Sequence, residues 1–406
     1  MSEQKHTKNG IAMAGIILVA LALRPSLVSI GPAIATIQHY FGMSHSMTGL
    51  LVSIPDLLMG MLALPAPWLM KKLGRDKLII GSLLLIAAST IARAYSPGVT
   101  SLLLCTAGVG AGIAIAGTLL SGFVKATFPT RAAFVMGIYS TSLSLGSTLS
   151  AVTTAPVLKA TNSWRVAIGI WAVPAVIGLI AWLFVAAKEK KAPVGKKSSR
   201  RGDIPWKNIT AWKIALFFAC VNIIFYSLLA WTAPLFIDHG LSTSMAGYVL
   251  GCFTFFFMLS SPVFGTLSKS LDRRSWLFAS AVITLSGLLT IALLPGFLPF
   301  VIIAVMAVGL GGAFTLGMTL SLDNTRHPEE TNAWTAFILT IGYLVAAVGP
   351  ILLGRLRDVT GTFLVPMLTL SGVAIVMLVL ALTLKPVVTS KTEDLEVLTE
   401  ERELAP

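Results

Sequence analysis

Long apolar segments alternate with short polar ones along most of the chain. Each apolar segment runs for about 20 residues, the length that an α-helix needs to cross the hydrocarbon core of a bilayer. The segments lack the alternation of a membrane β-barrel, so the chain is predicted to span the membrane as helices. Twelve spans are predicted, at 10–36, 47–70, 77–95, 100–124, 133–157, 165–187, 211–237, 243–267, 276–294, 300–322, 333–354 and 363–384.

The second half of the chain repeats features of the first. Gly110-Ala111-Gly112 and Gly309-Leu310-Gly311 lie 199 residues apart, as do Pro129 and Pro328. Duplicated sets of membrane helices are typical of transporters, whose two halves rock about a site held between them. The predicted fold is therefore an all-α membrane protein with twelve transmembrane helices in two six-helix pseudo-symmetric bundles.

Two polar segments divide the chain. The longest interruption, KEKKAPVGKKSSRRGDIPWK at 188–207, is basic and contains two prolines and a glycine, which is typical of a flexible tether. We expect a first bundle at 1–187, a basic cytoplasmic linker at 188–210, a second bundle at 211–385 and an acidic cytoplasmic tail at 386–406.

Composition and charge place the chain in a membrane. Of its 406 residues 55% are hydrophobic and 12% are charged, whereas soluble domains carry roughly 25% charged residues. The net charge of +13 does not indicate nucleic-acid binding, because 24 of the 30 Lys and Arg residues fall in the termini and the loops on one side. This asymmetry predicts a multi-pass protein of the bacterial inner membrane with both termini in the cytoplasm.

The chain lacks the motifs that ATP binding, nucleophilic catalysis and metal binding require. The chain has no Gly-x-x-x-x-Gly-Lys-[Ser/Thr] loop for ATP, no nucleophile motif and no spacing of Cys or His that suits a metal. The three cysteines fall singly within predicted spans, and the five histidines fall in tails, loops or span ends. We therefore expect no enzyme activity, no cofactor and no metal.

Two charged residues lie deep within predicted spans. Arg24 is 14 residues into the first span, and Asp56 is about nine residues into the second, which runs the opposite way. Burying a charge there costs roughly 2.5–3.5 kcal/mol on the insertion scale, so each should face a cavity or a partner. Arg24 would attract an anionic or dipolar solute and Asp56 would bind a coupled proton; alternatively, the two form a structural ion pair.

The seventh span opens the second half with polar residues on one face. Asn222 and Tyr226 are four residues apart, and Trp231 follows. Aligning the prolines at 32 and 234 places Tyr226 opposite Arg24 in the duplicated frame. These side chains would orient a solute or would hydrogen-bond neighbouring helices. Tyr139 and Tyr343 are further candidates for the solute site.

Glycines gather within the fourth and tenth predicted spans, and they include Gly110 and Gly311. Small residues let helices approach closely. The contact would either slide during alternating access or pack statically, and the sequence does not separate these two hypotheses.

The basic loop after the second span resembles the Gly-x-x-x-Asp-Arg-x-Gly-Arg-Arg motif of the major facilitator superfamily. Gly74 and Arg75 match it, and in the second half Gly265, Arg273 and Arg274 match. Pro67, Lys71 and Asp76 depart from it. The resemblance implies a gating role for Gly74, Arg75 and Arg273, within a network that differs from that of the family.

Within this superfamily the chain is similar to the cyanate permease and 2-nitroimidazole transporter branch. The residues that carry the resemblance are Leu23-Arg24-Pro25, Gly31-Pro32, Pro55, Arg93, Lys125, Met136–Ser140, Trp231, Gly309–Phe314, Leu322-Asp323, Gly342-Tyr343 and Gly349-Pro350. By this resemblance Arg24 is the arginine of the first helix, and Asn222 with Tyr226 is the polar pair of the seventh.

The chain also departs from the branch. Gly117 and Leu339 stand where an amide is typical, and Asp56 where the residue is usually apolar. In the fifth span Ser150-Ala151 replaces the Gly-Pro that drug–proton antiporters carry after Gly137 and Gly146. The substrate is therefore not transferred directly from the branch, and a drug exporter is disfavoured.

The predicted function is secondary active transport of a small anion or polar heteroaromatic solute, similar to cyanate or a nitroimidazole, by alternating access. Proton coupling, as in a symport, is a hypothesis that depends on Asp56. Efflux of toxic compounds or drugs is one alternative, and a membrane sensor that keeps the transporter fold without flux is another. The expected partners are the solute, the bilayer and protons; we expect a monomer that binds no nucleic acid.

Overall fold

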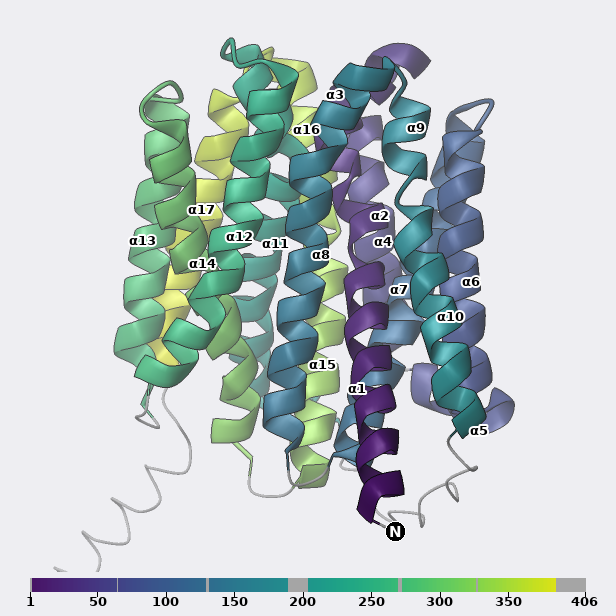
Figure 1. Ribbon diagram of the computed structural model, residues 1–406. Helices are drawn as coiled ribbons and strands as arrows, with labels where there is room; N and C mark the ends of the chain where they lie inside the picture. Colours follow the sequence, from purple (N-terminus) through teal and green to yellow (C-terminus); the bar gives the residue numbers. More distant parts are fainter. Residues whose placement is uncertain are drawn as a thin grey trace, which may run out of the picture.

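The computed structural model describes residues 2–63, 65–128, 131–188, 204–268, 272–325 and 328–384, and in these residues every regular element is an α-helix. Figure 1 shows the helices standing side by side in two groups, one from each half of the chain. The helices are α1 Ser2–Leu23, α2 Pro25–Val28, α3 Ile30–Phe41, α4 His45–Ala63, α5 Ala66–Leu73, α6 Arg75–Ala94, α7 Val99–Thr127, α8 Ala132–Thr161, α9 Trp164–Gly169, α10 Ala172–Lys188, α11 Ile209–Asp238, α12 Thr243–Leu267, α13 Arg274–Leu293, α14 Pro299–Asp323, α15 Pro328–Ala346, α16 Val348–Thr360 and α17 Leu364–Thr383.

The helices combine into the twelve predicted spans. The first span consists of α1, α2 and α3, the sixth of α9 and α10, and the eleventh of α15 and α16. The second span is shorter than predicted: α4 ends at Ala63, and residues 66–70 belong to the separate short helix α5. Eleven spans among the described residues are long and apolar enough to cross a membrane by themselves. The twelfth is α8, a helix of 30 residues in which many Ser and Thr residues lower the mean hydropathy.

Prolines explain where the broken spans break. Pro25 has no N–H to donate to the carbonyl oxygen four residues earlier, so the first span loses a helical hydrogen bond there and α1 ends just before Arg24. The eleventh span breaks at Ala347, three residues before Pro350. The polar backbone groups freed at such breaks must find partners inside the protein, because lipid offers none.

Small residues bring helices together at matching places in the two halves. A Cβ atom on Gly110 of α7 would lie 2.5 Å from the Cα atom of Pro55 in α4, and one on Gly311 of α14 would lie 2.5 Å from the carbonyl oxygen of Phe257 in α12. In both halves a glycine of the fourth helix thus lies against the backbone of the second helix.

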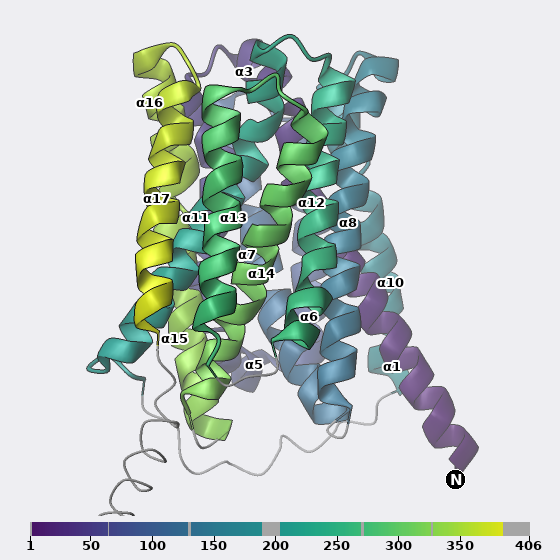
Figure 2. The same cartoon turned by 90° about the vertical axis from the view of Figure 1, so that its left-hand side faces the viewer.

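Among the described residues, three helices of the first half pack on the second half: α4 and α8, which form two seams, and α3, which packs on α11 and α12. Figure 2 shows α8 beside α12. In the first seam, α4 packs on α15 and α16, and a Cβ on Gly49 would lie 2.5 Å from the carbonyl oxygen of Pro350. In the second, α8 packs on α12: Gly247 contacts Ala155, and the hydroxyls of Thr148 and Thr254 are 3.1 Å apart.

We call the side that holds the N-terminus the terminal side and the other the far side. In α4 the seam begins at His45, at the far side, and extends to Gly60, which abuts Leu344 in the middle of the eleventh span. The close contacts between halves among the described residues therefore run from the far side to the middle of the helices. This arrangement closes the molecule at the far side.

The predicted tail at 386–406 and most of the predicted linker lie outside the described residues. The end of the linker is described, and there the indole nitrogen of Trp212 donates to the carbonyl oxygen of Trp206 at 2.9 Å, while both rings pack on Phe337. The chain thus enters α11 against the eleventh span of the same half.

Replacing Gly110 with alanine tests the close approach of α4 and α7. The added Cβ would push on backbone, and overpacking costs about 1–3 kcal/mol, so we expect a lower unfolding temperature in detergent. The matched control is Gly122→Ala on the same helix, where a Cβ meets no atom within 4 Å and helix propensity improves by about 1 kcal/mol. Equal shifts for the two variants would contradict the packing described.

Candidate functional site

Arg24 lies at the break of the first span and reaches the second half of the protein. Its Nη1 atom donates a hydrogen bond of 2.8 Å to the hydroxyl of Tyr226 in α11. The guanidinium lies 5.9 Å from the centre of the same ring. Tyr226 is 1% exposed, whereas Arg24 keeps partial exposure. A positive charge thus stands where the two halves meet, and its partner is a neutral phenol.

Two further tyrosines surround this cation. The charge of Arg24 acts on the phenols of Tyr139 in α8 and Tyr343 in α15. The Tyr343 ring packs on the Tyr226 ring with a centroid distance of 6.1 Å. A Cβ on Gly117 of α7 would lie 3.6 Å from the Tyr139 hydroxyl, so the absence of a side chain there leaves that hydroxyl room. Both halves contribute phenols to one site.

Asp56 is completely buried in α4, and neither of its carboxyl oxygens has a hydrogen-bond partner among the described residues. It shares a helix face with Gly49, Ser53 and Gly60, the face that packs on the eleventh span. The charge of Arg24 acts on it, but the ion pair between Arg24 and Asp56 does not form. Arg24 bonds to Tyr226 instead.

Asn222 and Trp231 lie on α11 and are less exposed than Arg24. Asn222 is 1% exposed, and its amide donates to the carbonyl oxygen of Phe218, one turn earlier, at 2.7 Å. The indole nitrogen of Trp231 donates to the carbonyl oxygen of Pro350 at 2.9 Å. The Trp231 ring lies toward the far side, beside His45 and Phe363. Trp231 therefore belongs to the seam rather than to the group around Arg24.

Arg93 is a second buried cation. It lies in the last turn of α6, near the end of the span predicted at 77–95, and is 0% exposed. Its Nη2 donates to the carbonyl oxygen of Ser26 at 2.5 Å, and Thr90 donates to the Ser26 hydroxyl at 3.0 Å. The Ser26 hydroxyl in turn donates to the carbonyl oxygen of Trp171. Arg93 thus holds the broken segment that positions Arg24, and the same network reaches the break of the sixth span.

The motif residues brace each half internally. Gly74 has a φ of 87° between α5 and α6. Arg75 pairs with Asp76 at 3.0 Å and stacks 4.6 Å from the centre of the Phe123 ring in α7. In the second half Arg273 pairs with Asp323 of α14 at 2.6 Å and also donates to Ser268. Each arginine joins the third helix of its half to the fourth, and the gating role that the resemblance implies stays a prediction.

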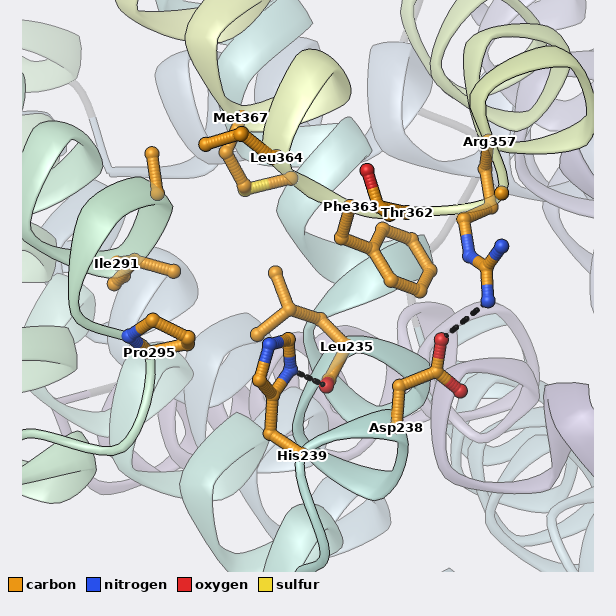
Figure 3. A pocket seen from close by; sticks show the side chains of 12 residues that line it. Leu235, Asp238, His239, Ile291, Pro295, Arg357, Thr362, Phe363, Leu364 and Met367 are labelled. Carbon is orange, nitrogen blue, oxygen red and sulfur yellow. Dashed lines mark hydrogen bonds and ion pairs between the residues drawn. The ribbon is translucent and has the colours of Figure 1, made fainter.

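A pocket of about 500 Å³ opens at the far side of the second half. Figure 3 shows its polar end, where Arg357 of α16 faces Asp238 of α11, and His239 turns toward its own helix. Arg357 pairs with Asp238 at 2.6 Å. The other walls are mainly apolar, from Leu235, Ile291, Pro295, Phe363 and Met367. No residue that the sequence predicted for the site lines this pocket.

Sequence reasoning missed the contact between His45 and Asp358, which lies beside this pocket. The Asp358 carboxylate accepts from both His45 and Ser46 across the seam. Ser44 before a helix is a recognisable cap signal, but nothing in the sequence links residues more than 300 positions apart.

Comparison with known proteins defines the class to which this fold and site belong. The profile of the Major Facilitator Superfamily matches residues 13–350 and again 215–401. The chain belongs to this superfamily and is a multi-pass membrane transporter.

Individual relatives agree with the branch that the sequence indicated. The cyanate transport protein CynX of Escherichia coli (strain K12) is 31% identical over 352 residues, 86% of this chain and 90% of that protein. The 2-nitroimidazole transporter of the same organism is 26% identical and covers 92% and 95%. The uncharacterized transporter YycB of Bacillus subtilis (strain 168) is 28% identical and covers 90% and 91%.

Solved structures agree on the fold. A bacterial homologue of the human lysosomal transporter Spinster, in an inward-facing and occupied conformation, superposes with a TM-score of 0.73 at 16% identity, over 93% of this chain and 96% of that one. The unoccupied form gives 0.71.

A double-mutant cycle measures the bond between Arg24 and Tyr226. We expect Arg24→Met and Tyr226→Phe to couple by about 1.5–3 kcal/mol in the free energy of unfolding, the usual range for a hydrogen bond from a charged group. The control cycle pairs Arg24→Met with Tyr343→Phe, and its coupling should be smaller because the hydrogen bond of Arg24 goes to Tyr226 and not to Tyr343. Equal coupling in both cycles would mean that the bond is not specific.

Proposed function

We propose that this chain is a secondary transporter that carries a small anion or a polar heteroaromatic solute across the bacterial inner membrane by alternating access. The observation that carries the proposal is the position of Arg24, a permanent cation at a helix break where both halves meet. The relatives named for cyanate and 2-nitroimidazole transport support the size and polarity of the solute.

Charge placement supports an orientation for this transporter. The excess of Lys and Arg on the terminal side follows the positive-inside rule, so we propose that this side faces the cytoplasm and that the far side is external. The closed far side then corresponds to a state open to the cytoplasm. Since one chain supplies both halves of the site, we propose that it works as a monomer.

The cluster around Arg24 suits a small planar or linear anion. A guanidinium offers several N–H groups in one plane and stays charged at any physiological pH. The Tyr226 hydroxyl occupies one of these donors, and an anion would displace it or bind beside it. The phenols of Tyr139 and Tyr343 would donate to the same anion, and Asn222 would lie one turn from Tyr226. A heteroaromatic ring would stack on the tyrosines.

We propose that Asp56 carries the coupled proton. An ionised carboxylate that is buried without partners costs several kcal/mol, so Asp56 either takes up a proton or pairs with Arg24. In the second case it competes with the anion for the same guanidinium. Protonation of Asp56 would therefore free Arg24 for the anion, and the two would move together as a symport. The direction of net flux, uptake or efflux, would follow the combined gradients.

Ligand binding tests the role of Arg24. Purified protein should gain about 2.7 kcal/mol of stability at a ligand concentration 100 times the dissociation constant, and we expect this for cyanate, nitroimidazoles or short carboxylates but not for sugars. Arg24→Gln should abolish the thermal shift. Arg165→Gln is the matched control, because Arg165 donates to the backbone of Ala94 instead. A ligand that stabilises Arg24→Gln and the wild type equally would exclude the proposed site.

The pH dependence of binding tests Asp56. As pH rises, Asp56 loses its proton and competes for Arg24, so anion affinity in the wild type should fall, by up to about tenfold per pH unit when one proton is linked to binding. Asp56→Asn should bind the anion at every pH and lose proton-driven accumulation in proteoliposomes. Asp238→Asn should keep the wild-type pH profile. If Asp56→Asn retains that profile, another group carries the proton.

A further inference from the structure

The far end of the seam contains a helix cap that is shared between the two halves. Asp358 of α16 accepts hydrogen bonds from the backbone N–H of His45 at 2.8 Å and of Ser46 at 2.9 Å, the first two residues of α4. The Nδ1 atom of His45 lies 2.7 Å from the same carboxylate. One acidic side chain of the second half thus makes three contacts to the start of a helix in the first half.

The helix depends on this residue for its complete cap. The first backbone N–H groups of a helix have no partner inside the helix. Ser44 satisfies one of them, since its hydroxyl accepts from Met47 at 3.2 Å, and Thr48 bonds to the carbonyl oxygen of Ser44 as in the helix. The N–H groups of His45 and Ser46 are left to Asp358. They lose that acceptor as soon as the halves separate at this end.

The cap requires the backbones of α4 and α16 to lie in direct contact. Gly354 lies one turn before Asp358 on the same face of α16, and a Cβ there would overlap the carbonyl oxygen of His45. One turn earlier again, Pro350 abuts Gly49 and accepts the hydrogen bond of Trp231. The face from Pro350 to Asp358 is therefore shaped to receive α4.

Among the described residues, Asp358 is the only charged side chain found in direct contact with His45. The neighbouring Arg357 turns to Asp238 of α11 and lies over the Phe363 ring. Arg355 on α16 is exposed, and α11 presents the Trp231 ring to the imidazole. On α3, His39 and Tyr40 are exposed, and Tyr40 accepts from Arg165. The charge of His45 therefore acts chiefly on Asp358.

We propose that Asp358, His45 and the first turn of α4 form an external latch that binds a proton and closes the transporter toward the outside. This inference rests on the proposed orientation and alternating access, and it adds a second proton site, separate from Asp56. When His45 is protonated, an imidazolium faces the Asp358 carboxylate and strengthens the closed state. When His45 is neutral, the charge attraction is lost and only hydrogen bonds hold the latch.

The sign of the effect follows directly. Acid outside favours protonated His45, so it favours the state closed to the outside. A neutral or alkaline exterior releases the latch and lets α4 separate from α16, where water then satisfies Asp358 and the two N–H groups. The latch therefore couples external pH to the direction in which the central site opens, whatever the solute is.

Distances between spin labels test the latch without a substrate. Labels on cysteines placed at Ala160 and Phe297, exposed at the external ends of the two halves, report opening in double electron–electron resonance once the three native cysteines are replaced. The ratio of closed to open molecules should rise as pH falls from about 8 to about 5, the range in which histidine titrates. His45→Gln should make that ratio independent of pH.

Two more variants separate the cap from the proton. Asp358→Asn should lower the closed-to-open ratio about fivefold at pH 8, because an amide has one acceptor oxygen where the carboxylate uses two. At pH 5 it should lower the ratio further, because the attraction to protonated His45 is lost as well. Gly354→Ala should also open the external side while it leaves both titratable groups in place. Asp238→Asn, whose ion pair lies within one half, should keep the wild-type distances. A second label pair within the first half, at Tyr95 and Ala160, should give one distance in all variants and so verify folding.

The distance measurements test the latch, and the binding measurements test the proposed solute, so each proposal can fail separately. Wild-type distances in Asp358→Asn at every pH, or an unchanged pH dependence in His45→Gln, would overturn the latch. Failure of every tested anion to bind would overturn the proposed solute and leave these distance measurements unaffected.

Discussion

The structure depends on placing one permanent positive charge inside a membrane protein. Arg24 avoids lipid because Pro25 ends the first helical segment at this residue and the chain there faces the second half. The cation finds a phenol rather than a carboxylate, so its charge is not cancelled by the Tyr226 bond. Arg93 holds the broken segment from behind through the carbonyl oxygen of Ser26. The broken helix therefore presents a cation to the boundary between halves, a costly arrangement that membrane proteins retain at functional sites.

Close helix packing decides which parts of the molecule can move. Within each half, glycines bring the fourth helix onto the second so closely that an added methyl group would touch backbone. Arg75 and Arg273 add charged contacts between the third and fourth helices of their own halves. Between halves the contacts run along α3, α4 and α8 and consist largely of glycine against backbone, with few hydrogen bonds apart from those that Asp358 accepts. Such a seam separates at low cost, so each half is expected to move as a rigid unit.

Local patterns in the sequence predicted the positions of the spans well, but they predicted only some of the contacts between side chains. The span at 243–267 coincides with α12, since its ends carry ordinary cap and loop signals. The duplicated frame matched Arg24 with Tyr226, because pseudo-symmetry relates the first helices of the two halves. The ion pair of Arg24 with Asp56, one of two hypotheses from the sequence, is not formed in this structure, because adjacency of two helices does not fix which faces meet. The bond of Arg93 to Ser26 joins residues 67 positions apart, so no local pattern indicated it. The contact of His45 with Asp358 depends on tertiary packing alone.

The two acidic groups at the seam do different physical work. Asp56 is buried without partners in the middle of the membrane, so its charge state must change or it must meet Arg24. Asp358 keeps some exposure at the far side and already has three donors, so it can remain ionised in both states and exchange protein donors for water. A group of the first kind can couple a proton to solute binding, because occupancy of the central site alters its surroundings. A group of the second kind biases only the opening of the seam. Asp56 lies on α4, and Asp358 of α16 caps the first turn of the same helix. The helix α4 therefore links the solute site to the external closure.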